Sequence, residues 1–356
     1  MRSLVERFCE MVQVDSESGN EARFVRYAAD LLARELGASC EIDDYGNLIA
    51  HVQPKDSTAD AVALCAHADT VKPGVGIEPV VEDGVVHSAG ETILAADDKA
   101  GLAEIVEAIL RADRHPAVDV VLTLGEEVGL LGARNLDLGK VRAKRAFVVD
   151  GELLHDVVIG GPTHILLDVT IIGRAAHAGM DPEKGISAIR VASSAIAQMP
   201  EGRIDAETTA NVGIIAGGLV RNGVPERCSI KAECRSLDHE KARAQARKMR
   251  EAFNTAAEAA GARAEIEETI AYEAQTIDET SPVVVAALDA VRSVGLDPVA
   301  KTITGGTDAL ILSNRGIDAV VLGTGVQDAH ATSEHVTVAD IEAAASILRN
   351  LLESLA

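Results

Sequence analysis

Short, largely apolar runs that each lead into acidic residues or a histidine are the feature that most constrains this chain. The first covers residues 61–66 and the second covers residues 118–124. Such runs are typical of strands buried on both faces, and open α/β sheets place their ligands at the carboxyl ends of those strands. We therefore expect the polar residues that follow to meet along one edge of a sheet. With two later runs at 146–149 and 319–324 included, those residues are His67, Glu126, Glu127, Asp150 and His330.

Strands and helices are expected to alternate in the first part of the chain. Helical spacing is found at 5–11, 22–36 and 100–110, and Gly37 follows the second of these segments as a helix-ending glycine. This alternation indicates the α/β class. The strands are expected at 40–42, 48–52, 61–66, 118–124 and 146–149.

From residue 164 the order of the expected elements changes to βαββαβ, which is typical of a compact ferredoxin-like unit. A helix, a strand and a closing helix then return to the first domain. A chain of 356 residues is also long enough for two cores. We therefore expect a discontinuous catalytic domain at 1–163 and 276–356, with a lid at 164–275. The lid elements are expected at 165–172, 186–199, 211–215, 228–235, 239–260 and 264–270, and the later ones at 282–294, 319–322 and 341–355.

Charge and composition exclude several kinds of partner. With 56 acidic against 33 basic residues, the formal net charge is -23, which disfavours binding to nucleic acid and to anionic membranes. No apolar stretch approaches the length of a membrane span, and the first residues are not expected to be a secretion signal. The five cysteines lack the spacing of a disulfide framework or a thiolate zinc site, so a cytoplasmic protein is expected.

The residue types at the strand ends point to a metal site. Imidazole and carboxylate ligands suit zinc, cobalt or manganese. Asp69 lies two residues after His67, on the same side of an extended chain, and is expected to orient the imidazole. A carboxylate such as Asp97 can bridge two ions roughly 3.5 to 4 Å apart, and a water between them can approach a pKa near 7. Of Glu126 and Glu127, one is then free to bind metal while the other transfers the proton.

Each of these motifs has an ordinary structural interpretation when it is taken alone. A His-x-Asp sequence is often a hydrogen-bonded core pair, and adjacent glutamates after a strand are often a solvated loop. Asp97 and Asp98 can serve as the N-terminal cap of a helix, and Asp150 can lie in a turn. His330, followed by His335, can belong to a polar loop. The joint occurrence of the motifs at successive strand ends favours the metal site.

The motifs that contain these residues resemble those of a known family. They lie at 66–70 (AHADT), 94–101 (LAADDKAG), 123–129 (TLGEEVG), 147–150 (FVVD), 173–179 (GRAAHAG) and 305–309 (GGTDA), before the final His330. Across essentially the whole chain they resemble the M20 family of co-catalytic zinc peptidases and amidohydrolases, most closely its peptidase T-like branch. The resemblance implies a di-zinc aminopeptidase-like catalytic domain, with a central mixed sheet flanked by helices, and an inserted lid that commonly mediates dimerisation.

The resemblance also implies which residues hold the metal. One ion would be held by His67 and Asp150, and the other by Glu127 and His330. Asp97 would bridge the two. Two divalent ions are therefore expected, zinc first, with cobalt and manganese as alternatives.

Three further residues receive catalytic roles from the resemblance. Glu126 would be the general base, and Asp69 would be the orienting carboxylate. His177 matches a lid histidine that, in related enzymes, reaches the active site of the partner subunit and polarises the scissile carbonyl; the alternative is a histidine on an ordinary turn. The peptide bond between Asp97 and Asp98 is expected to be cis.

Substrate contacts are expected from the lid and from a glycine pair. Asn222 and Arg235 match lid positions implicated in substrate contact, and the planar guanidinium suits a carboxylate. Arg235 could equally pair with a local acid such as Asp238. Gly305 and Gly306 would let the backbone approach the substrate, although a plain turn would use the same residues.

The resemblance implies hydrolysis of an amide bond in small peptides, by a tripeptide-type aminopeptidase that forms a homodimer through its lid. The alternatives within the family are an N-acyl amino acid amidohydrolase and a carboxypeptidase or dipeptidase. An inactive metal-binding relative is a different class, but loss of Glu126 or Asp97 would mark it. A serine or cysteine hydrolase fits poorly, because no G-x-S-x-G motif occurs. The exact substrate, the native metal and the oligomeric state stay open.

Overall fold

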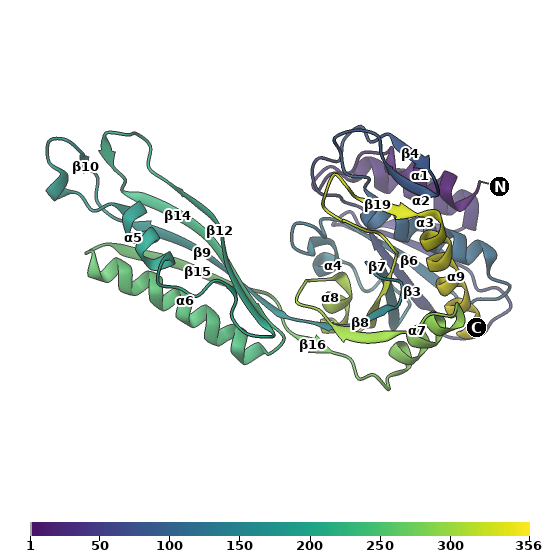
Figure 1. Ribbon diagram of the computed structural model, residues 1–356. Helices are drawn as coiled ribbons and strands as arrows, with labels where there is room; N and C mark the ends of the chain where they lie inside the picture. Colours follow the sequence, from purple (N-terminus) through teal and green to yellow (C-terminus); the bar gives the residue numbers. More distant parts are fainter. Residues whose placement is uncertain (1) are drawn as a thin grey trace. The chain divides into compact units, whose positions relative to one another are not determined.

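The protein is described here by a computed structural model that covers residues 2–356, and its contacts divide it into two units (Figure 1). The larger unit contains the chain up to Gly160 together with Thr276–Thr302 and Gly306–Ala356. The inserted unit contains Gly161–Gln275 and Ile303–Gly305. An α/β domain with a second domain inserted into it is the predicted fold, and that prediction is confirmed.

A mixed nine-stranded sheet forms the centre of the larger unit, in the order β1-β2-β6-β3-β7-β18-β8-β16, with β17 paired to β8. Four neighbouring strands in its middle run parallel, so their carboxyl ends lie at one edge. These four are β6 (Val118–Thr123), β3 (Val62–His67), β7 (Arg145–Gly151) and β18 (Asp318–Gly323). The others are β1 (Ser39–Ile42), β2 (Leu48–Val52), β8 (Asp156–Gly161), β16 (Gln275–Thr276) and β17 (Val299–Thr302).

Helices cover the sheet and close its core. Apolar residues of five helices pack with alternate residues of β3, such as Val62 and Leu64, in one continuous cluster. These helices are α1 (Leu4–Val12), α2 (Ala22–Leu36), α3 (Ala96–Arg111), α7 (Pro282–Ser293) and α9 (Val338–Ser354). Two short helices, α4 (Leu131–Asn135) and α8 (Asp308–Asn314), contact the strands β6, β7 and β18.

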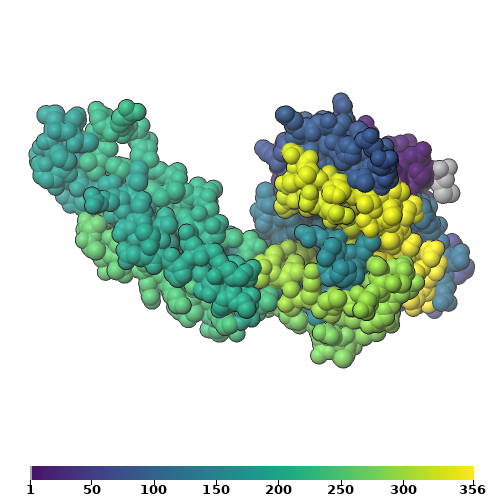
Figure 2. Space-filling model, viewed as in Figure 1, coloured from purple at the N-terminus to yellow at the C-terminus, as the bar shows by residue number. Residues whose placement is uncertain are grey.

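A small three-stranded sheet, which the sequence pattern does not predict, joins distant parts of the larger unit. It pairs β4 (Pro79–Glu82) with β5 (Val85–Ser88), and β5 with β19 (His335–Thr337). In Figure 2 the yellow C-terminal atoms accordingly lie against the blue atoms of this region. The segment after His330 is therefore fixed to a hairpin far away in sequence.

The inserted unit is a five-stranded antiparallel sheet, in the order β11-β12-β14-β9-β15, with two helices packed on one face. The expected order βαββαβ is confirmed. Alternate residues of the inner strand β9, Ile165, Leu167, Val169 and Ile171, pack under the helices. The main elements are β9 (Thr163–Ile172), α5 (Ala188–Ile196), β12 (Thr208–Gly217), β14 (Arg227–Ser236), α6 (His239–Ala259) and β15 (Arg263–Tyr272); the short ones are β10 (Ala176–His177), η1 (Pro182–Lys184), β11 (Gly202–Arg203) and β13 (Gly223–Val224).

Several helices begin or end a few residues away from their expected bounds, among them α5 and α3. The helix expected from residue 186 starts at Ala188, because the Ser187 hydroxyl caps it by accepting a hydrogen bond from the Arg190 amide. The helix expected from residue 100 starts at Ala96, although Asp97 and Asp98 have non-helical backbone angles. Within residues 2–356, no helix is both long and apolar enough to cross a membrane.

Candidate metal centre

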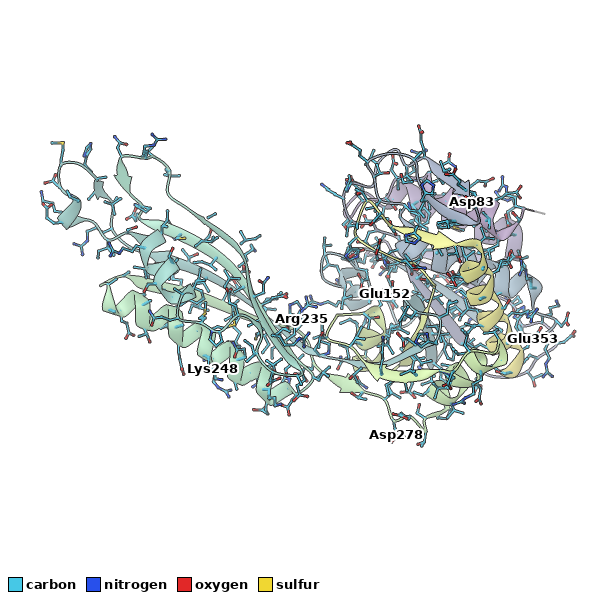
Figure 3. The ribbon with its side chains drawn as sticks, in the orientation of Figure 1. Asp83, Glu152, Arg235, Lys248, Asp278 and Glu353 are labelled. Carbon is cyan, nitrogen blue, oxygen red and sulfur yellow. The ribbon has the colours of Figure 1, made fainter. Side chains whose placement is uncertain are left out.

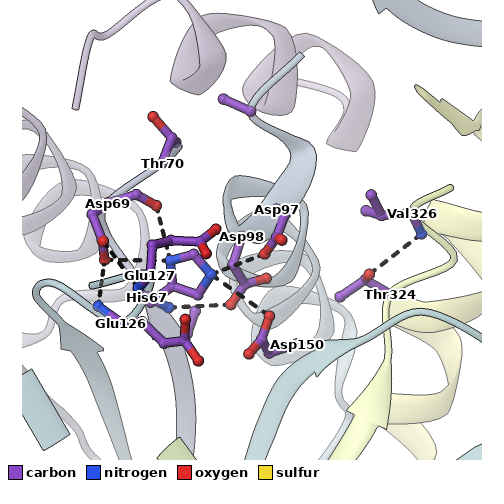
Figure 4. Close-up of polar contacts among 12 residues, drawn as sticks. His67, Asp69, Thr70, Asp97, Asp98, Glu126, Glu127, Asp150, Thr324 and Val326 are labelled. Carbon is purple, nitrogen blue, oxygen red and sulfur yellow. Dashed lines mark hydrogen bonds and ion pairs between the residues drawn. The ribbon is translucent and has the colours of Figure 1, made fainter. Parts of the chain in front are cut away.

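His67 is the last residue of β3 and lies at the parallel edge of the central sheet (Figure 4). Its side chain is only 2% exposed. The Nδ1–H donates a hydrogen bond of 2.9 Å to the backbone carbonyl of Asp69, which orients the ring and leaves Nε2 facing the acidic residues. Nε2 lies 2.9 Å from Asp97 Oδ1 and 3.6 Å from Asp150 Oδ1. This nitrogen could therefore serve as a metal ligand.

The two carboxylate oxygens of Asp97 face different histidines. Oδ1 faces His67, whereas Oδ2 lies 3.2 Å from His330 Nε2. The same His330 nitrogen lies 2.8 Å from Glu127 Oε1. Two groups of possible ligands consequently share Asp97, one with His67 and Asp150 and the other with Glu127 and His330, each with its ligand atoms within 4.8 Å of one another.

The charges in this cluster favour the binding of a cation. Burial disfavours a charged His67, but hydrogen bonds to the surrounding carboxylates, Asp150 first, raise its pKa well above the usual value. Hydrogen bonds with Asp97 and Glu127 raise the pKa of His330 to about 10. Burial raises the pKa of Asp150 to about 7. These groups hold protons against a surplus of negative charge, and a divalent cation would displace those protons. Imidazole nitrogens and carboxylate oxygens are also the donors that zinc takes.

Asp69 ties the glutamate pair to the same edge. Its carboxylate accepts hydrogen bonds from the amides of Glu126 and Glu127, at 2.9 and 3.3 Å, and from the Ser18 hydroxyl at 2.7 Å. It also lies 3.5 Å from His67 Nδ1. Glu126 lies near His67 and Glu127, and these three residues form a third group of possible metal ligands. Burial raises the pKa of Glu126 well above its usual value.

The Asp97–Asp98 peptide is cis, as the family resemblance implies. Asp98 is buried and accepts a hydrogen bond of 3.1 Å from the His67 amide. Burial raises the pKa of Asp98 well above its usual value. Of the adjacent aspartates, the first therefore faces the imidazoles and the second holds the end of β3.

Sequence patterns do not single out several residues that support this site. Asn47 accepts a hydrogen bond from the Leu124 amide at 3.1 Å and donates one of 3.1 Å to the Gly132 carbonyl, so it braces the loop that carries the glutamates. Asp308, in the matched segment 305–309, is buried beside Thr123, whose hydroxyl donates to it. Nothing in the local spacing of the sequence distinguishes Asn47 or Asp308 from other polar residues.

His177 and Asn222 come together in the inserted unit, where β10 pairs with β13. The Ala178 amide donates to the Asn222 carbonyl at 2.9 Å. The His177 ring is exposed, and its Nδ1 accepts hydrogen bonds from the amides of Gly179 and Met180, both at 3.1 Å. Because Nδ1 is an acceptor, the neutral ring carries its proton on Nε2.

Arg235, which Figure 3 labels, lies one residue before the end of β14, and its side chain contacts Glu233. Its Nη2 donates to Glu233 Oε2 at 3.2 Å, and the same oxygen lies 2.6 Å from His164 Nε2. The local acid that contacts Arg235 is thus Glu233, whereas Asp238 caps α6. Within residues 2–356, Arg235 Nε is buried and has no hydrogen-bond partner.

Gly305 and Gly306 stand where the contacts of the chain change from one unit to the other. A Cβ atom added at Gly305 would meet only Ile303, at the ordinary contact distance of 3.6 Å. Packing within the chain therefore does not require a glycine at position 305.

Comparisons with known proteins agree with this arrangement. Residues 163–261 match the family described as the peptidase dimerisation domain, and residues 47–157 match peptidase family M28. Protein YqjE of Bacillus subtilis is 38% identical over 368 residues, which cover 100% of this chain and 99% of the relative.

Two solved structures share both sequence and fold with the chain. Aminopeptidase PepT from Bacillus cereus is 38% identical, with a TM-score of 0.87 over 99% of this chain and 98% of its own. A tripeptidase from Staphylococcus aureus is 33% identical, with a TM-score of 0.91 over 99% of this chain and 97% of its own. The chain belongs to the M20 family of peptidases, in its peptidase T-like branch.

Proposed function

We propose that this peptidase is a di-metal aminopeptidase that removes the N-terminal residue from tripeptides and other short peptides. The observation that carries the proposal is the Asp97 carboxylate, which presents one oxygen to each of two histidine-containing ligand groups. The similarity to an aminopeptidase PepT and to a tripeptidase supports the same reaction.

The residues divide between the two ions as follows in this proposal. His67 and Asp150 would hold one ion, Glu127 and His330 would hold the other, and Asp97 would contribute to both. Zinc is the metal that fits these donors best, with cobalt or manganese as substitutes. When bound, the pair of ions supplies Lewis acidity and lowers the pKa of a water toward neutrality.

Glu126 takes the proton from the attacking water and returns it to the leaving amine. Its amide is held by the Asp69 carboxylate, so the side chain starts from a fixed backbone position. The backbone carbonyl of Asp69 accepts the hydrogen bond that orients the His67 ring, so this one residue positions both the base and a ligand.

His177 acts as the donor that polarises the scissile carbonyl. Its Nδ1 is occupied by two backbone amides, so Nε2–H is the group available to a carbonyl oxygen. The match to a peptidase dimerisation domain supports a homodimer, in which we assign this histidine to the active site of the partner.

Arg235, Asn222 and the backbone at Gly305 and Gly306 select the substrate. The Arg235 side chain is 26% exposed, and its guanidinium has donors beyond the one that contacts Glu233, which suits a peptide carboxylate. The surplus of acidic residues, with a formal net charge of -23, suits a substrate with a cationic amino terminus.

The proposal is tested by a metal-reconstituted assay on matched substrates. The protein is stripped with a chelator, reloaded with zinc, cobalt or manganese, and offered free tripeptides, N-acetylated tripeptides, dipeptides and N-acyl amino acids at equal concentration. We expect no turnover without metal and a preference for the free amine. Faster release of the acetyl group would identify an N-acyl amino acid amidohydrolase instead, and full activity in the stripped protein would exclude the metal mechanism.

A further inference from the structure

Glu334 is a buried acid that joins two parts of the candidate metal centre. Glu334 is only 1% exposed. Oε2 accepts hydrogen bonds from the amides of Leu94 and Ala95, both at 2.8 Å, and Oε1 accepts one of 2.9 Å from the Asp97 amide. A carboxylate 240 residues away along the chain therefore satisfies three amides around the start of α3.

These amides have few other ways to be satisfied. Ala95 precedes α3 with a φ of 59°, and no side chain of the capping residue itself bonds the first turn. The first amides of a helix have no partner within the helix, and buried amides without partners are costly. Glu334 thus holds the backbone conformation that aims the Asp97 side chain.

The same residue lies in the loop that carries His330. This loop is closed by two backbone hydrogen bonds between Gln327 and His335, of 2.9 and 3.1 Å, and the Glu334 amide donates to the Ala331 carbonyl at 3.0 Å. His330 lies within this closed loop. The Glu334 carboxylate consequently fixes the loop of one metal ligand onto the backbone of another.

The effect on the two ligand groups should be unequal. Asp97 and His330 both belong to the group that includes Glu127, whereas the other group takes only Asp97 from this connection. That other group is also held from the opposite side, where the His67 amide donates to Asp98. Loosening Glu334 therefore moves two ligands of one ion and only one ligand of the other.

We propose that Glu334 is a positioning residue that sets the affinity of the ion held by Asp97, Glu127 and His330. The inference rests on the proposed di-metal function. In Glu334→Gln, one carboxylate oxygen becomes an amide nitrogen that faces a backbone N–H, so either the Leu94 and Ala95 bonds or the Asp97 bond is lost. Losing a group that orients metal ligands typically weakens metal binding roughly 10 to 100-fold.

The control is Glu104→Gln, which lies on α3, the helix whose first amides bond to Glu334. Glu104 is fully buried, and neither of its carboxylate oxygens has a hydrogen-bond partner within residues 2–356. Burial raises its pKa well above the usual value, so the amide replaces a neutral acid of the same shape. This variant reproduces a buried Glu-to-Gln change without touching the amides near Asp97.

Zinc binding is measured by equilibrium dialysis on full-length wild type, Glu334→Gln, Glu334→Asp and Glu104→Gln, and thermal unfolding of the chelated proteins checks the fold. We expect two ions in wild type and in the control. Glu334→Gln should keep one ion near wild-type affinity, bind the second roughly 10 to 100-fold more weakly, and recover turnover at high zinc with little change in KM. Rescue by metal would not follow from a general loss of structure.

Four results would overturn the inference. Two ions bound with wild-type affinity by Glu334→Gln would leave the di-metal proposal intact and reject the role of Glu334. Equal weakening of both ions, or no rescue by zinc in a folded variant, would do the same. Fewer than two ions in wild type would reject the proposed function, and the inference with it. If the Gln variant does not fold, the Asp variant, which keeps the charge but shortens the side chain, must show the loss of the second ion.

Discussion

The candidate residues of the larger unit and those of the inserted unit are held in different ways. In the larger unit, Asp69 alone contacts a ligand, the base and the Ser18 hydroxyl, and these partners come from separate segments. In the inserted unit, the exposed ring of His177 accepts hydrogen bonds from backbone amides of its own turn, and within residues 2–356 it has no other hydrogen-bond partner. The first arrangement fixes a geometry in a buried place, whereas the second presents a donor at the surface.

This difference distinguishes the residues of the metal centre from the residues that meet the substrate or a partner subunit. A metal centre tolerates little movement of its ligands, so cross-links between distant segments suit it. A residue that meets substrate or a partner subunit must stay accessible, so local fixation suits it. Substitutions in the larger unit should therefore change turnover or metal affinity, whereas those in the inserted unit should change substrate binding or, at His177, a turnover that subunit mixing can restore.

The largest effect is expected for Glu126→Gln. Because the amide group cannot accept the proton, turnover should fall roughly 100 to 10,000-fold, the range for loss of a general base. Two metal ions should still bind, because the proposed ligands are intact. Turnover and zinc content are measured on the same preparation, with the exposed Glu279→Gln as the control. Near-normal turnover by Glu126→Gln would show that Glu126 is not the general base.

The strand-end residues can be predicted from sequence because their signal is local. His67 and Asp150 follow or close apolar runs, and the parallel strands then bring them together. Asn47 and Glu334 carry no such signal. Their partners lie 77 and 240 residues away, so the hydrogen bonds exist only once the sheet and the loop before β19 have formed.

The small sheet was missed for a related reason. Its strands are three or four residues long, and β19 pairs with β5 across most of the chain. Such short segments give little alternation to read, and the pairing is decided by tertiary contacts. The inserted unit was easier, because its long strands alternate clearly between buried and exposed residues.

The next effect in size is expected for His177→Ala. Loss of a donor to the developing oxyanion should lower turnover roughly 100 to 1000-fold. If the histidine acts across a dimer, mixing this variant with Glu126→Gln should restore part of the activity, since hybrid dimers contain one complete site. A monomeric, fully active wild type would contradict the assignment to the partner subunit.

A smaller effect is expected for Arg235→Ala. A hydrogen bond to a charged group contributes about 1.5 to 3 kcal/mol, so KM for peptides with a free carboxyl end should rise roughly 10 to 150-fold. Peptides with an amidated carboxyl end should change little. Arg227→Ala, an exposed arginine on the same strand, is the control. An equal loss on both kinds of peptide would mean that Arg235 serves the fold of the inserted unit instead.

The smallest effect is expected for Glu233→Gln, and it tests that structural alternative directly. The hydrogen bond with His164, followed by the charge of Arg235, lowers the pKa of Glu233 to about 2. A lowered pKa stabilises the folded state above the unfolded pKa of about 4.3, and this stabilisation is lost as the pH falls toward 2. For a partly exposed pair we expect about 1 kcal/mol.

Urea unfolding of wild type and Glu233→Gln between pH 7 and pH 3 measures this contribution. The chain has no tryptophan, so tyrosine fluorescence follows the unfolding; of the three tyrosines, Tyr272 belongs to the inserted unit, and its ring lies 5.3 Å from that of His164. The difference in unfolding free energy should be largest near neutral pH and should shrink below about pH 4.3, where the unfolded glutamate begins to hold its proton. A difference that stays constant across this range would show that the carboxylate charge contributes nothing, and that Glu233 acts through packing alone.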